Sequence, residues 1–437
     1  MINETHNPEL KSWVASANGH RDFPIQNLPL GVFNRRGGTE SPRVGSAIGD
    51  KIVDTGAANQ AGLFTGAAER AGNACEKPTL NALMALKPEH VSALRARLSD
   101  LLREDSGERE TCQRCVLSSD EVELRLPVDV GDYTDFYASV FHATNVGSMF
   151  RPDNPLLPNY KHVPIAYHGR ASSIVLSGTP VRRPLGQAKA DDQPAPSYGA
   201  SKLLDYELEI GLFVGQGNPH GRPIPIGKAA DHIFGLCIVN DWSARDLQKW
   251  EYQPLGPFLA KSFVTSISPW VVTLEALAPF RAPAFERPDG DPRPLPYLSS
   301  KDDRAAGGVD LTVEVYLASQ QMQERGLEPM RLSRGNLRDM YWTIAQMLTH
   351  HASNGCNLRP GDMMATGTVS GPGKDSRGCL LELTWRGSEP LSLPTGEERK
   401  FLADGDEVTI QAFCERDGAA RIGFGECTGT ITPPLSV

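Results

Sequence analysis

Residues 202–214, KLLDYELEIGLFV, alternate apolar and acidic side chains and then become wholly apolar. Successive side chains of a β-strand point to opposite faces, so this alternation predicts a strand with one apolar and one acidic face. The acidic face would carry Asp205, Glu207 and Glu209 in a row. Like charges held this close near an interior raise one another's pKa. The face must therefore be either solvated, which is the commoner case for an isolated E-x-E, or neutralised by a cation.

The composition is that of a globular protein. The chain has 437 residues, enough for two or three domains with a substantial core. Charged residues make up 22% and hydrophobic residues 40%, which is a balance typical of ordered rather than disordered proteins. The formal net charge of −9, with no basic block to offset it, argues against a nucleic-acid-binding protein. An acidic chain can still bind a small anion through a local cluster of Arg and Lys.

Nothing in the sequence predicts export or membrane insertion. The first residues, MINETHNPELKSW, lack the charged and apolar regions of a signal peptide, and no apolar run approaches the roughly 18 residues that a membrane span needs. Of the eight cysteines only Cys112 and Cys115 form a C-x-x-C, without a second pair or a histidine spaced for zinc. We therefore expect reduced thiols in a cytoplasmic protein that binds no membrane.

The order of predicted elements favours a mainly β, α+β fold. Two consecutive helices are predicted at Thr79–Leu86 and Pro88–Arg103, and from residue 122 the chain reads mostly as strands with Pro- and Gly-rich connections. A further helix is predicted at Leu337–His350 from apolar residues at helical spacing, whereas Leu380–Trp385 reads as a buried strand. Many strands and few helices indicate a β-sandwich or roll rather than a doubly wound α/β sheet.

Four segments combine chemically able side chains with neighbouring apolar runs: the acidic strand and residues 132–145, 239–265 and 365–372, with one further acid downstream. Outside the acidic strand their candidate residues are Asp135, Tyr137, His142, Asp241, Arg245, Gln248, Tyr252, Lys261, Thr265, Thr368 and Glu382. The sequence has no serine elbow, P-loop or dinucleotide fingerprint. This absence argues against acyl-serine, nucleotide and NAD chemistry.

The candidates also have structural interpretations. His142 alone is more often a partly buried histidine with its hydrogen bonds satisfied, and Asp241 alone is more often a helix N-cap, here before WSARD. Glu382 is harder to explain in this way, because an unpaired carboxylate in an apolar strand is costly. Its expected partner is a histidine, an arginine or a metal cluster.

Four of the acids suit one kind of site. Asp135, Glu207, Glu209 and Asp241 together would form an all-oxygen cage, which favours a hard cation such as Ca²⁺ or Mg²⁺ over zinc. These acids lie on three separate segments of the chain. Their spacing alone therefore does not establish that they converge.

Seven segments resemble the fumarylacetoacetases of the fumarylacetoacetate hydrolase family. They are FPIQNLPLGVF, DYTDFYASVFHATNVG, YHGRASSIVLSGTPVRRP, YELEIGLFVG, NDWSARDLQKWEYQPLGPFLAKSF, THHASNGCNLRPGDMMATGTVSGP and DGDEVTI. The resemblance runs from residue 23 to the C-terminus and is looser over residues 34–120. The broader family shares mainly the E-x-E and the carboxylate matched by Asp241. The first segment and the WSARDLQKWEYQPLGPF run point to the hydrolase itself.

The resemblance implies an architecture and bound ions. It implies a small N-terminal SH3-like β-barrel domain with a helical segment, residues 1–127, and a C-terminal mixed β-sandwich roll, residues 128–437, assembled as a homodimer. Its Ca²⁺ ligands match Asp135, Glu207, Glu209 and Asp241. The positions around a second cation, usually Mg²⁺, match Asp241, Lys261 and Thr265.

The resemblance also implies a reaction. This is hydrolysis of the C–C bond of 4-fumarylacetoacetate, a dicarboxylic β-diketone, to fumarate and acetoacetate, the last step of tyrosine and phenylalanine breakdown. His142 matches the general base and Glu382 the carboxylate that orients it. The oxyanion stabilisers match Arg245, Gln248 and Lys261. The substrate contacts match Tyr137, Arg151, Tyr167, Gln248, Tyr252 and Thr368.

Two other functions stay open at this stage. A related metal enzyme, either an acylpyruvate hydrolase or a decarboxylase, isomerase or hydratase of another oxo-acid, would share the acidic cage. It would not need the pair of His142 and Glu382. A calcium-stabilised β-domain without catalysis would have no use for Arg245, Gln248 and Lys261 beside the carboxylates.

Overall fold

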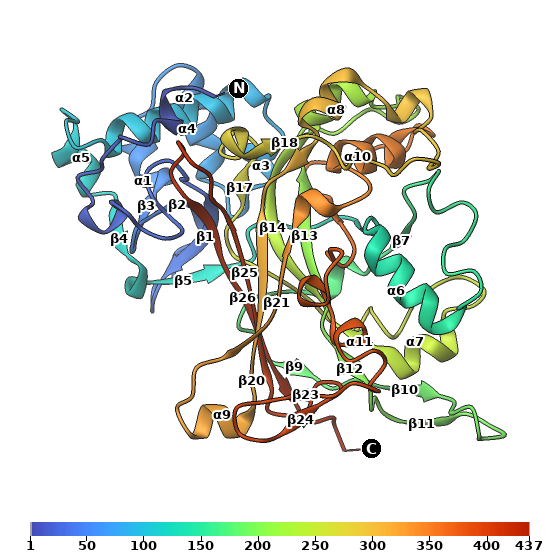
Figure 1. Cartoon of the computed structure of the whole chain (residues 1–437). Helices are drawn as coiled ribbons and strands as arrows, with labels where there is room; N and C mark the ends of the chain where they lie inside the picture. Colours follow the sequence, from blue (N-terminus) through green and yellow to red (C-terminus); the bar gives the residue numbers. More distant parts are fainter. Residues whose placement is uncertain (1, 437) are drawn as a thin grey trace.

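A computed structural model describes residues 2–436, and Figure 1 shows how its elements are arranged. The first part of the chain forms a five-stranded antiparallel sheet in the order β4-β3-β2-β1-β5, with five helices beside it. The strands are β1 (Leu30–Arg35), β2 (Arg43–Ile48), β3 (Lys51–Asp54), β4 (Val116–Ser118) and β5 (Val122–Arg125). The helices are α1 (Thr55–Gln60), α2 (Ala67–Cys75), α3 (Asn81–Met84), α4 (Pro88–Leu102) and α5 (Arg109–Gln113). The two helices predicted here are confirmed as α3 and α4, whereas closure of the sheet into an SH3-like barrel stays a prediction.

A large mixed sheet forms the centre of the remaining chain. Its strands pair in the order β7-β6-β22-β13-β14-β16-β8, and β17 also pairs with β14. The pairs β22–β6 and β16–β8 are parallel, and the other pairs are antiparallel. The strands are β6 (Tyr133–Phe136), β7 (Ala166–His168), β8 (Ile174–Leu176), β13 (Leu208–Val214), β14 (Ile233–Asp241), β16 (Thr265–Ile267), β17 (Val272–Thr273) and β22 (Met363–Ala365).

A second sheet of long strands packs along the first. Its order is β21-β20-β25-β26-β9, and Figure 1 shows β25 and β26 running past β13 and β14. Its strands are β9 (Val181–Arg182), β20 (Thr312–Ala318), β21 (Met330–Asn336), β25 (Glu407–Cys414) and β26 (Ile422–Thr432). The short strand pairs are β10 (Leu185–Ala188) with β11 (Ser197–Ala200), β12 (Leu204–Asp205) with β15 (Ser243–Ala244), β18 (Arg281–Ala282) with β19 (Gly308–Val309), and β23 (Leu391–Ser392) with β24 (Glu398–Arg399). The helices of this part are α6 (Val140–Phe150), α7 (Arg245–Glu251), α8 (Lys301–Ala306), α9 (Gln320–Glu324), α10 (Ile344–Ala352) and α11 (Leu380–Leu383).

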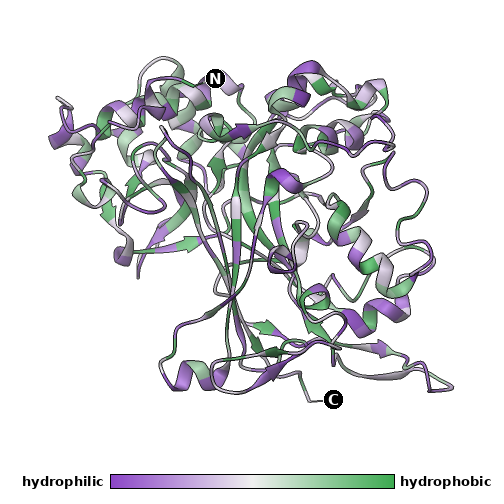
Figure 2. Ribbon diagram, viewed as in Figure 1, coloured by the Kyte–Doolittle hydropathy of each residue, from purple (hydrophilic) through white to green (hydrophobic). Residues whose placement is uncertain are grey.

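Both faces of the large sheet are buried, which explains why the sequence becomes wholly apolar after the acidic residues of 202–214. On β13, Ile210 and Leu212 belong to the core shared with the second sheet, whereas Phe213 belongs to a core on the opposite face. Figure 2 shows the hydrophobic residues along these central strands. A strand covered on both faces needs apolar side chains at successive positions, so alternation ends where this double burial begins.

The core of the first 127 residues continues into the large sheet. Ala71 of α2 and Leu98 of α4 lie in the same hydrophobic cluster as Phe213 and Val239. Main-chain hydrogen bonds also join Leu30 of β1 to Val271, with N–O distances of 3.0 and 2.8 Å. The two parts of the chain therefore pack through one continuous apolar core.

The acidic strand predicted over residues 202–214 is interrupted. Strand β12 ends at Asp205 and β13 begins at Leu208, so the chain leaves the strand at Tyr206 and Glu207. The alternation itself is confirmed, because Leu204, Tyr206 and Leu208 are all fully buried in one core. The interruption lies where the pairing partner changes, because β12 pairs with β15 and β13 pairs with β14.

The predicted single helix at Leu337–His350 is wrong. A 3₁₀ turn covers Leu337–Asp339, and α10 begins only at Ile344. Thr343 caps α10, since its hydroxyl accepts from the N–H of Gln346 at 3.1 Å and its own N–H donates to that side chain at 3.0 Å. This reciprocal capping box starts a new helix inside an apolar stripe.

The predicted strand at Leu380–Trp385 is also wrong, because Leu380–Leu383 form the short helix α11. The helix ends where Trp385 and Arg386 take left-handed backbone angles, with φ of 46° and 59°. An apolar run of this length shows that a segment is buried and does not distinguish a strand from a short helix.

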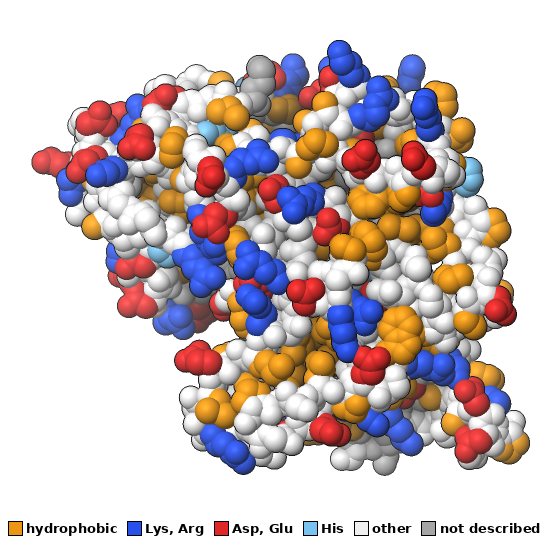
Figure 3. All heavy atoms as spheres, viewed as in Figure 1, with side chains coloured by type: hydrophobic (Ala, Val, Ile, Leu, Met, Phe, Trp, Pro, Cys, Tyr) orange, Lys and Arg blue, Asp and Glu red, His pale blue; other side chains and the backbone are white. Residues whose placement is uncertain are grey.

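The surface carries charges of both signs. Figure 3 shows basic and acidic side chains interspersed over one face of the molecule, with hydrophobic side chains between them. Among residues 2–436, no helix combines the length and the apolar character needed to span a membrane.

We expect Thr343→Val to lower the free energy of unfolding by about 1 kcal/mol, because the change removes the cap of α10. It also removes a hydrogen bond to Asp303 of 2.9 Å. Urea unfolding followed by far-UV circular dichroism measures the loss. Thr39→Val, at an exposed threonine, is the control. Equal stability of the two variants would show that the cap does not define this helix start.

Candidate active site

A cavity of about 440 Å³ is lined by residues of β6, β13, α6 and α7. Its volume lies in the range typical of small-molecule sites. The predicted site residues in its wall are Asp135, Tyr137, His142, Arg151, Tyr167, Glu207, Glu209, Arg245, Gln248, Tyr252, Lys261 and Thr368. The other three predicted residues, Asp241, Thr265 and Glu382, are buried and hydrogen-bond with each other or with wall residues. The fold therefore brings all the predicted site residues into one region.

Three strands of the large sheet bring three of the four predicted cage acids together. Asp135 lies on β6, Glu209 on β13 and Asp241 at the end of β14, and these strands belong to the same sheet. Alternation places the three acids on the face of the sheet that carries Phe213 and Val239. One carboxylate oxygen from each acid lies within 4.8 Å of the others. Each acid is at most 1% exposed.

Within the described residues, this cluster contains buried oxygens that have no hydrogen-bond partner, Oδ1 of Asp135 and Oε1 of Glu209. The Tyr167 hydroxyl lies 2.9 Å from Oδ2 of Asp135 and 2.8 Å from Oδ2 of Asp241. A phenol has one hydrogen to donate, so Tyr167 alone cannot fully satisfy both carboxylates. The all-oxygen donor set with unpaired oxygens fits a hard divalent cation.

The pKa shifts of these acids have the same origin. Burial and then the nearby charge of Asp241 raise the pKa of Asp135 well above its ordinary value. Burial and then the charge of Asp135 raise the pKa of Glu209 in the same way. Without a cation, protons must reduce the repulsion between these carboxylates. A cation that binds here has to replace those protons.

Glu207 is held apart from this cluster by two cations. Its Oε1 accepts from Nη1 of Arg245 at 2.7 Å, and its Oε2 pairs with the ammonium group of Lys261. Burial opposes ionisation of Glu207, but the charges of Arg245 and Lys261 hold its pKa well below the ordinary value. The predicted four-acid cage is therefore present as three converging acids with a fourth beside them. A role for Glu207 as a metal ligand stays a prediction.

Lys261 connects the two groups of acids. Its ammonium also donates to Oδ2 of Asp241 at 2.7 Å, and Thr265, which pairs with Asp241 across β14 and β16, donates to Oδ1 at 2.9 Å. Burial lowers the pKa of Lys261, but the charges of Asp241 and Glu207 raise it well above the ordinary value. A fixed positive charge thus already lies at the position expected for a second cation. Binding of Mg²⁺ there stays a prediction.

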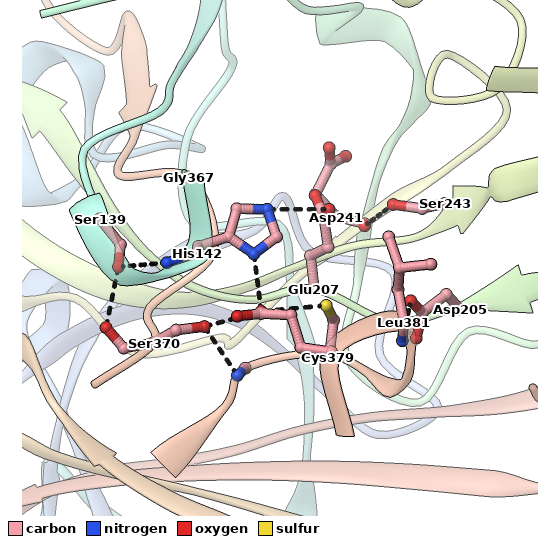
Figure 4. A network of polar contacts seen from close by, with 12 residues as sticks. Ser139, His142, Asp205, Glu207, Asp241, Ser243, Gly367, Ser370, Cys379 and Leu381 are labelled. Carbon is pink, nitrogen blue, oxygen red and sulfur yellow. Dashed lines mark hydrogen bonds and ion pairs between the residues drawn. The ribbon is translucent and has the colours of Figure 1, made fainter. Parts of the chain in front are cut away.

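His142 on α6 is held by Glu382. Its Nδ1 lies 2.6 Å from Oε2 of the fully buried Glu382. Figure 4 shows the ring of His142 among its polar contacts. Burial opposes ionisation of Glu382, but the charge of His142 and hydrogen bonds from His142, Asn145 and Ser370 lower its pKa to about 2. An ionised carboxylate only accepts hydrogen bonds, so Nδ1 must donate, and whenever the ring is neutral its lone pair is on Nε2. Nε2 faces Oε1 of Glu207 at 4.0 Å.

The residues that fix Glu382 were missed by sequence reasoning. Asn145 donates to its Oε1 at 2.8 Å, Ser370 donates to its Oε2 at 2.8 Å, and Sγ of Cys379 lies 3.2 Å from Oε2. Asn145 follows His142 by three residues on one helix, and that spacing was a usable signal. Ser370 and Cys379 come from irregular segments whose sequence gives no such signal.

The turn after β22 requires glycine. Gly367 has φ of +74°, and a Cβ there would lie 2.1 Å from the carbonyl oxygen of Phe136. Its N–H donates to Oε2 of Glu209 at 3.2 Å, so the turn holds one acid of the cluster in place. The next residue, Thr368, lines the cavity.

Helix α7 supplies the polar side chains opposite the acids. Arg245 and Gln248 lie one turn apart on the same side of α7, as predicted, and Nη1 of Arg245 donates to Oε1 of Gln248 at 3.2 Å. Tyr252, just after this helix, and Arg151, just after α6, are exposed residues of the cavity wall. Asp241 does not cap a helix, because α7 begins four residues later with Ala244 as its N-cap.

Comparison with known families matches both parts of the chain. The family described as "Fumarylacetoacetase N-terminal" matches residues 26–127, and the family described as "Fumarylacetoacetate (FAA) hydrolase C-terminal" matches residues 133–432. The chain belongs to the fumarylacetoacetate hydrolase family. It is therefore a hydrolase, and the resemblance of its motifs to this family is confirmed over most of its length.

Relatives in distant organisms match almost end to end. The fumarylacetoacetase of Bos taurus is 51% identical over 421 residues, which cover 95% of this chain and 97% of the relative. That of Oryza sativa subsp. japonica is 47% identical over 433 residues and covers 98% of each chain. The solved structure of the fumarylacetoacetate hydrolase from Exiguobacterium antarcticum covers 93% of this chain and 99% of that chain, with a TM-score of 0.51 and 18% identity. This last likeness concerns the fold alone.

We expect Ca²⁺ or Mg²⁺ to raise the melting temperature of the metal-free protein, by an amount that grows with pH. In the folded metal-free protein Asp135 and Glu209 hold protons that the unfolded chain releases above about pH 4. The metal-free protein therefore loses stability as the pH rises through their raised pKa values, and a cation binds more tightly over the same range. Differential scanning fluorimetry between about pH 5 and pH 8, with and without chelator, measures this. A cation effect that shrinks as the pH rises would contradict it.

Glu209→Gln should abolish most of the cation-induced rise in melting temperature, because an amide oxygen is a weaker ligand without charge. Glu314→Gln, at a buried glutamate of β20 that pairs with Arg331, is the matched control and should keep the full rise. Calcium content measured by mass spectrometry gives an independent readout. An unchanged rise in Glu209→Gln would remove this residue from the cation site.

Proposed function

We propose that the chain hydrolyses the C–C bond of 4-fumarylacetoacetate to give fumarate and acetoacetate, the final step of tyrosine and phenylalanine breakdown. The observation that carries the proposal is that the pair of His142 and Glu382 meets the acidic cluster at one cavity. The name of the relatives supports the same substrate, since the fumarylacetoacetase of Homo sapiens is 50% identical over 95% of this chain.

The proposed cation is Ca²⁺, held by Asp135, Glu209 and Asp241 with Glu207 beside them. Among the described residues, Arg245 and Lys261 pair with Glu207 and Asp241, so a divalent ion would offset the negative charge that remains on the acids. When bound, the ion supplies a Lewis acid that polarises the two oxygens of the β-diketone.

In the proposed mechanism His142 is the general base. Its free Nε2 takes a proton from a water molecule, and the resulting hydroxide attacks the carbonyl carbon on the fumaroyl side. Glu382 holds the ring in the tautomer that leaves Nε2 unprotonated and stabilises the imidazolium once it forms. The short bond between Nδ1 and Glu382 supports this assignment.

Charged and polar donors would stabilise the tetrahedral oxyanion. We assign this role to Arg245, Gln248 and Lys261, because preorganised donors in a buried site lower the barrier most where charge develops. When the C–C bond breaks, its electron pair passes to the acetoacetate fragment as an enolate, and the proton held by His142 can then reach that carbon. The groups proposed to hold the rest of the substrate are Tyr137, Arg151, Tyr167, Tyr252 and Thr368.

The domain organisation, the assembly, the location and the second cation are part of the same proposal. The family matches to residues 26–127 and 133–432 support a domain boundary near residue 127. The N-terminal SH3-like barrel and the C-terminal catalytic roll are proposed on the resemblance alone. Assembly as a homodimer, a cytoplasmic location and the second cation at Lys261 and Thr265 are proposed on the resemblance alone.

His142→Ala should keep the fold and the cation-induced rise in melting temperature but lower turnover by roughly 10²–10⁴-fold, the usual effect of losing a general base. His90→Ala, on α4 in the N-terminal part, is the control and should keep wild-type turnover. Loss of the β-diketone absorbance measures the rate. Near wild-type turnover in His142→Ala would refute the assignment of the base.

The substrate is tested by fumarate release from the purified protein, with and without chelator and after the cation is restored. We expect release that the chelator abolishes and Ca²⁺ restores. A panel of acylpyruvates and other small oxo-acids separates the proposal from its nearest alternatives. Faster turnover of any panel member than of fumarylacetoacetate would overturn the proposed substrate.

A further inference from the structure

Asp205 is the acid of the 202–214 stretch that lies outside the wall of the 440 Å³ cavity and outside the cluster of Asp135, Glu209 and Asp241. It is fully buried at the end of β12. Its Oδ1 accepts from the N–H of Leu380 at 2.8 Å, and its Oδ2 accepts from the N–H of Leu381 at 3.0 Å and from Nε of Arg245 at 2.9 Å. One carboxylate thus connects the first turn of α11 to the first residue of α7, as Figure 4 shows in part.

The contacts to α11 determine where Glu382 lies. The first N–H groups of a helix have no partner within the helix, and the N-cap residue of α11, Cys379, provides no side-chain cap. Asp205 provides these hydrogen bonds from another part of the chain. Glu382 follows Leu381 directly, and α11 packs against α6, the helix of His142. The position of the Glu382 carboxylate relative to His142 therefore depends on Asp205.

The contact to Arg245 determines the direction of the guanidinium. Asp205 binds the Nε side, so Nη1 is left to contact Glu207 and Gln248 in the cavity wall. The pairing of β12 with β15 places Asp205 opposite Ser243, two residues before Arg245. The guanidinium is thus held on its Nε side by an acid that lies outside the cavity wall.

We propose that Asp205 is a positioning residue that aligns both the Glu382–His142 pair and the Arg245 guanidinium. The proposal rests on the function proposed above. It assigns no contact with substrate or cation to Asp205. Its effect is exerted on the chemical step through Glu382 and Arg245, and it leaves the cavity and the acidic cluster unchanged.

Asp205→Asn is the test, because the amide keeps the shape of the carboxylate but loses its charge and one acceptor. We expect kcat to fall by about 10–100-fold, the usual range for residues that orient a catalytic group. KM and the cation-induced rise in melting temperature should change little. Asp54→Asn is the matched control, since Asp54 is equally buried, caps α1 at Ala57 and pairs with Arg43 at 2.8 Å. It should lose similar stability and keep wild-type kcat per folded molecule.

A double-mutant cycle with Glu382→Gln tests whether the effect passes through Glu382. In that background Asp205→Asn should lower kcat by a smaller factor than in the wild type, smaller by about threefold or more. The reason is that the effects of coupled residues are not additive. Additive losses would overturn action through Glu382. A kcat of Asp205→Asn within about twofold of wild type, or an equal loss in Asp54→Asn, would overturn the proposal as a whole.

If Asp205→Asn does not fold, Asp205→Ser, which retains an acceptor for the α11 N–H groups, takes its place. Failure of both to fold while Asp54→Asn folds would overturn a positioning role.

If the wild type releases no fumarate, the proposed function fails, and the NMR resonance of the His142 Nδ1 proton replaces kcat as the measured quantity. Asp205→Asn should move that resonance and Asp54→Asn should not; an unmoved resonance would overturn the proposal.

Discussion

The rest of this structure depends on how negative charge is buried at one end of the large sheet. Each buried carboxylate needs compensation, because an unpaired charge in the interior destabilises a protein by several kcal/mol. Glu207 is compensated by two cations, Glu382 by an imidazole and neutral donors, and Asp205 by backbone N–H groups and a guanidinium. Asp135 and Glu209 keep oxygens without a partner in the described chain. These carboxylate oxygens carry the negative charge that is still uncompensated, and they therefore indicate where a cation would bind.

Burial of the sheet on both faces makes this arrangement possible. With apolar cores on either side of β13 and β14, the ends of these strands lie in a medium of low polarity. Hydrogen bonds and ion pairs are stronger there than in water, and so are repulsions between like charges. The same packing that shields the imidazole of His142 therefore forces the neighbouring acids to hold protons or a metal ion. The proposed acid–base chemistry and the proposed ion binding would thus have one physical origin in this fold.

Sequence reasoning succeeded where the signal is local and failed where a contact spans the chain. Alternation over residues 204–210 separated apolar from acidic side chains correctly, because a two-residue period is a property of the strand itself. The break at Glu207 was invisible, since it lies where the partner strand changes from β15 to β14, and the local sequence does not show that change. The segment around Glu382 was assigned to a strand because its helix is started by Asp205, 175 residues earlier. A histidine was among the expected partners of Glu382, whereas Ser370 gave no recognisable pattern.

The continuous core between the first 127 residues and the large sheet has a consequence for inherited variation. Ala71 and Leu98 touch no catalytic group, yet they pack in the same cluster as the strand that carries Glu209. A loss of 1–2 kcal/mol in such a core changes the amount of protein that survives cellular quality control several-fold. Variants in the N-terminal helices would then lower the amount of enzyme without changing its chemistry. A compound that binds the folded state would raise the amount of such a variant, whereas it would not restore a lost reacting side chain.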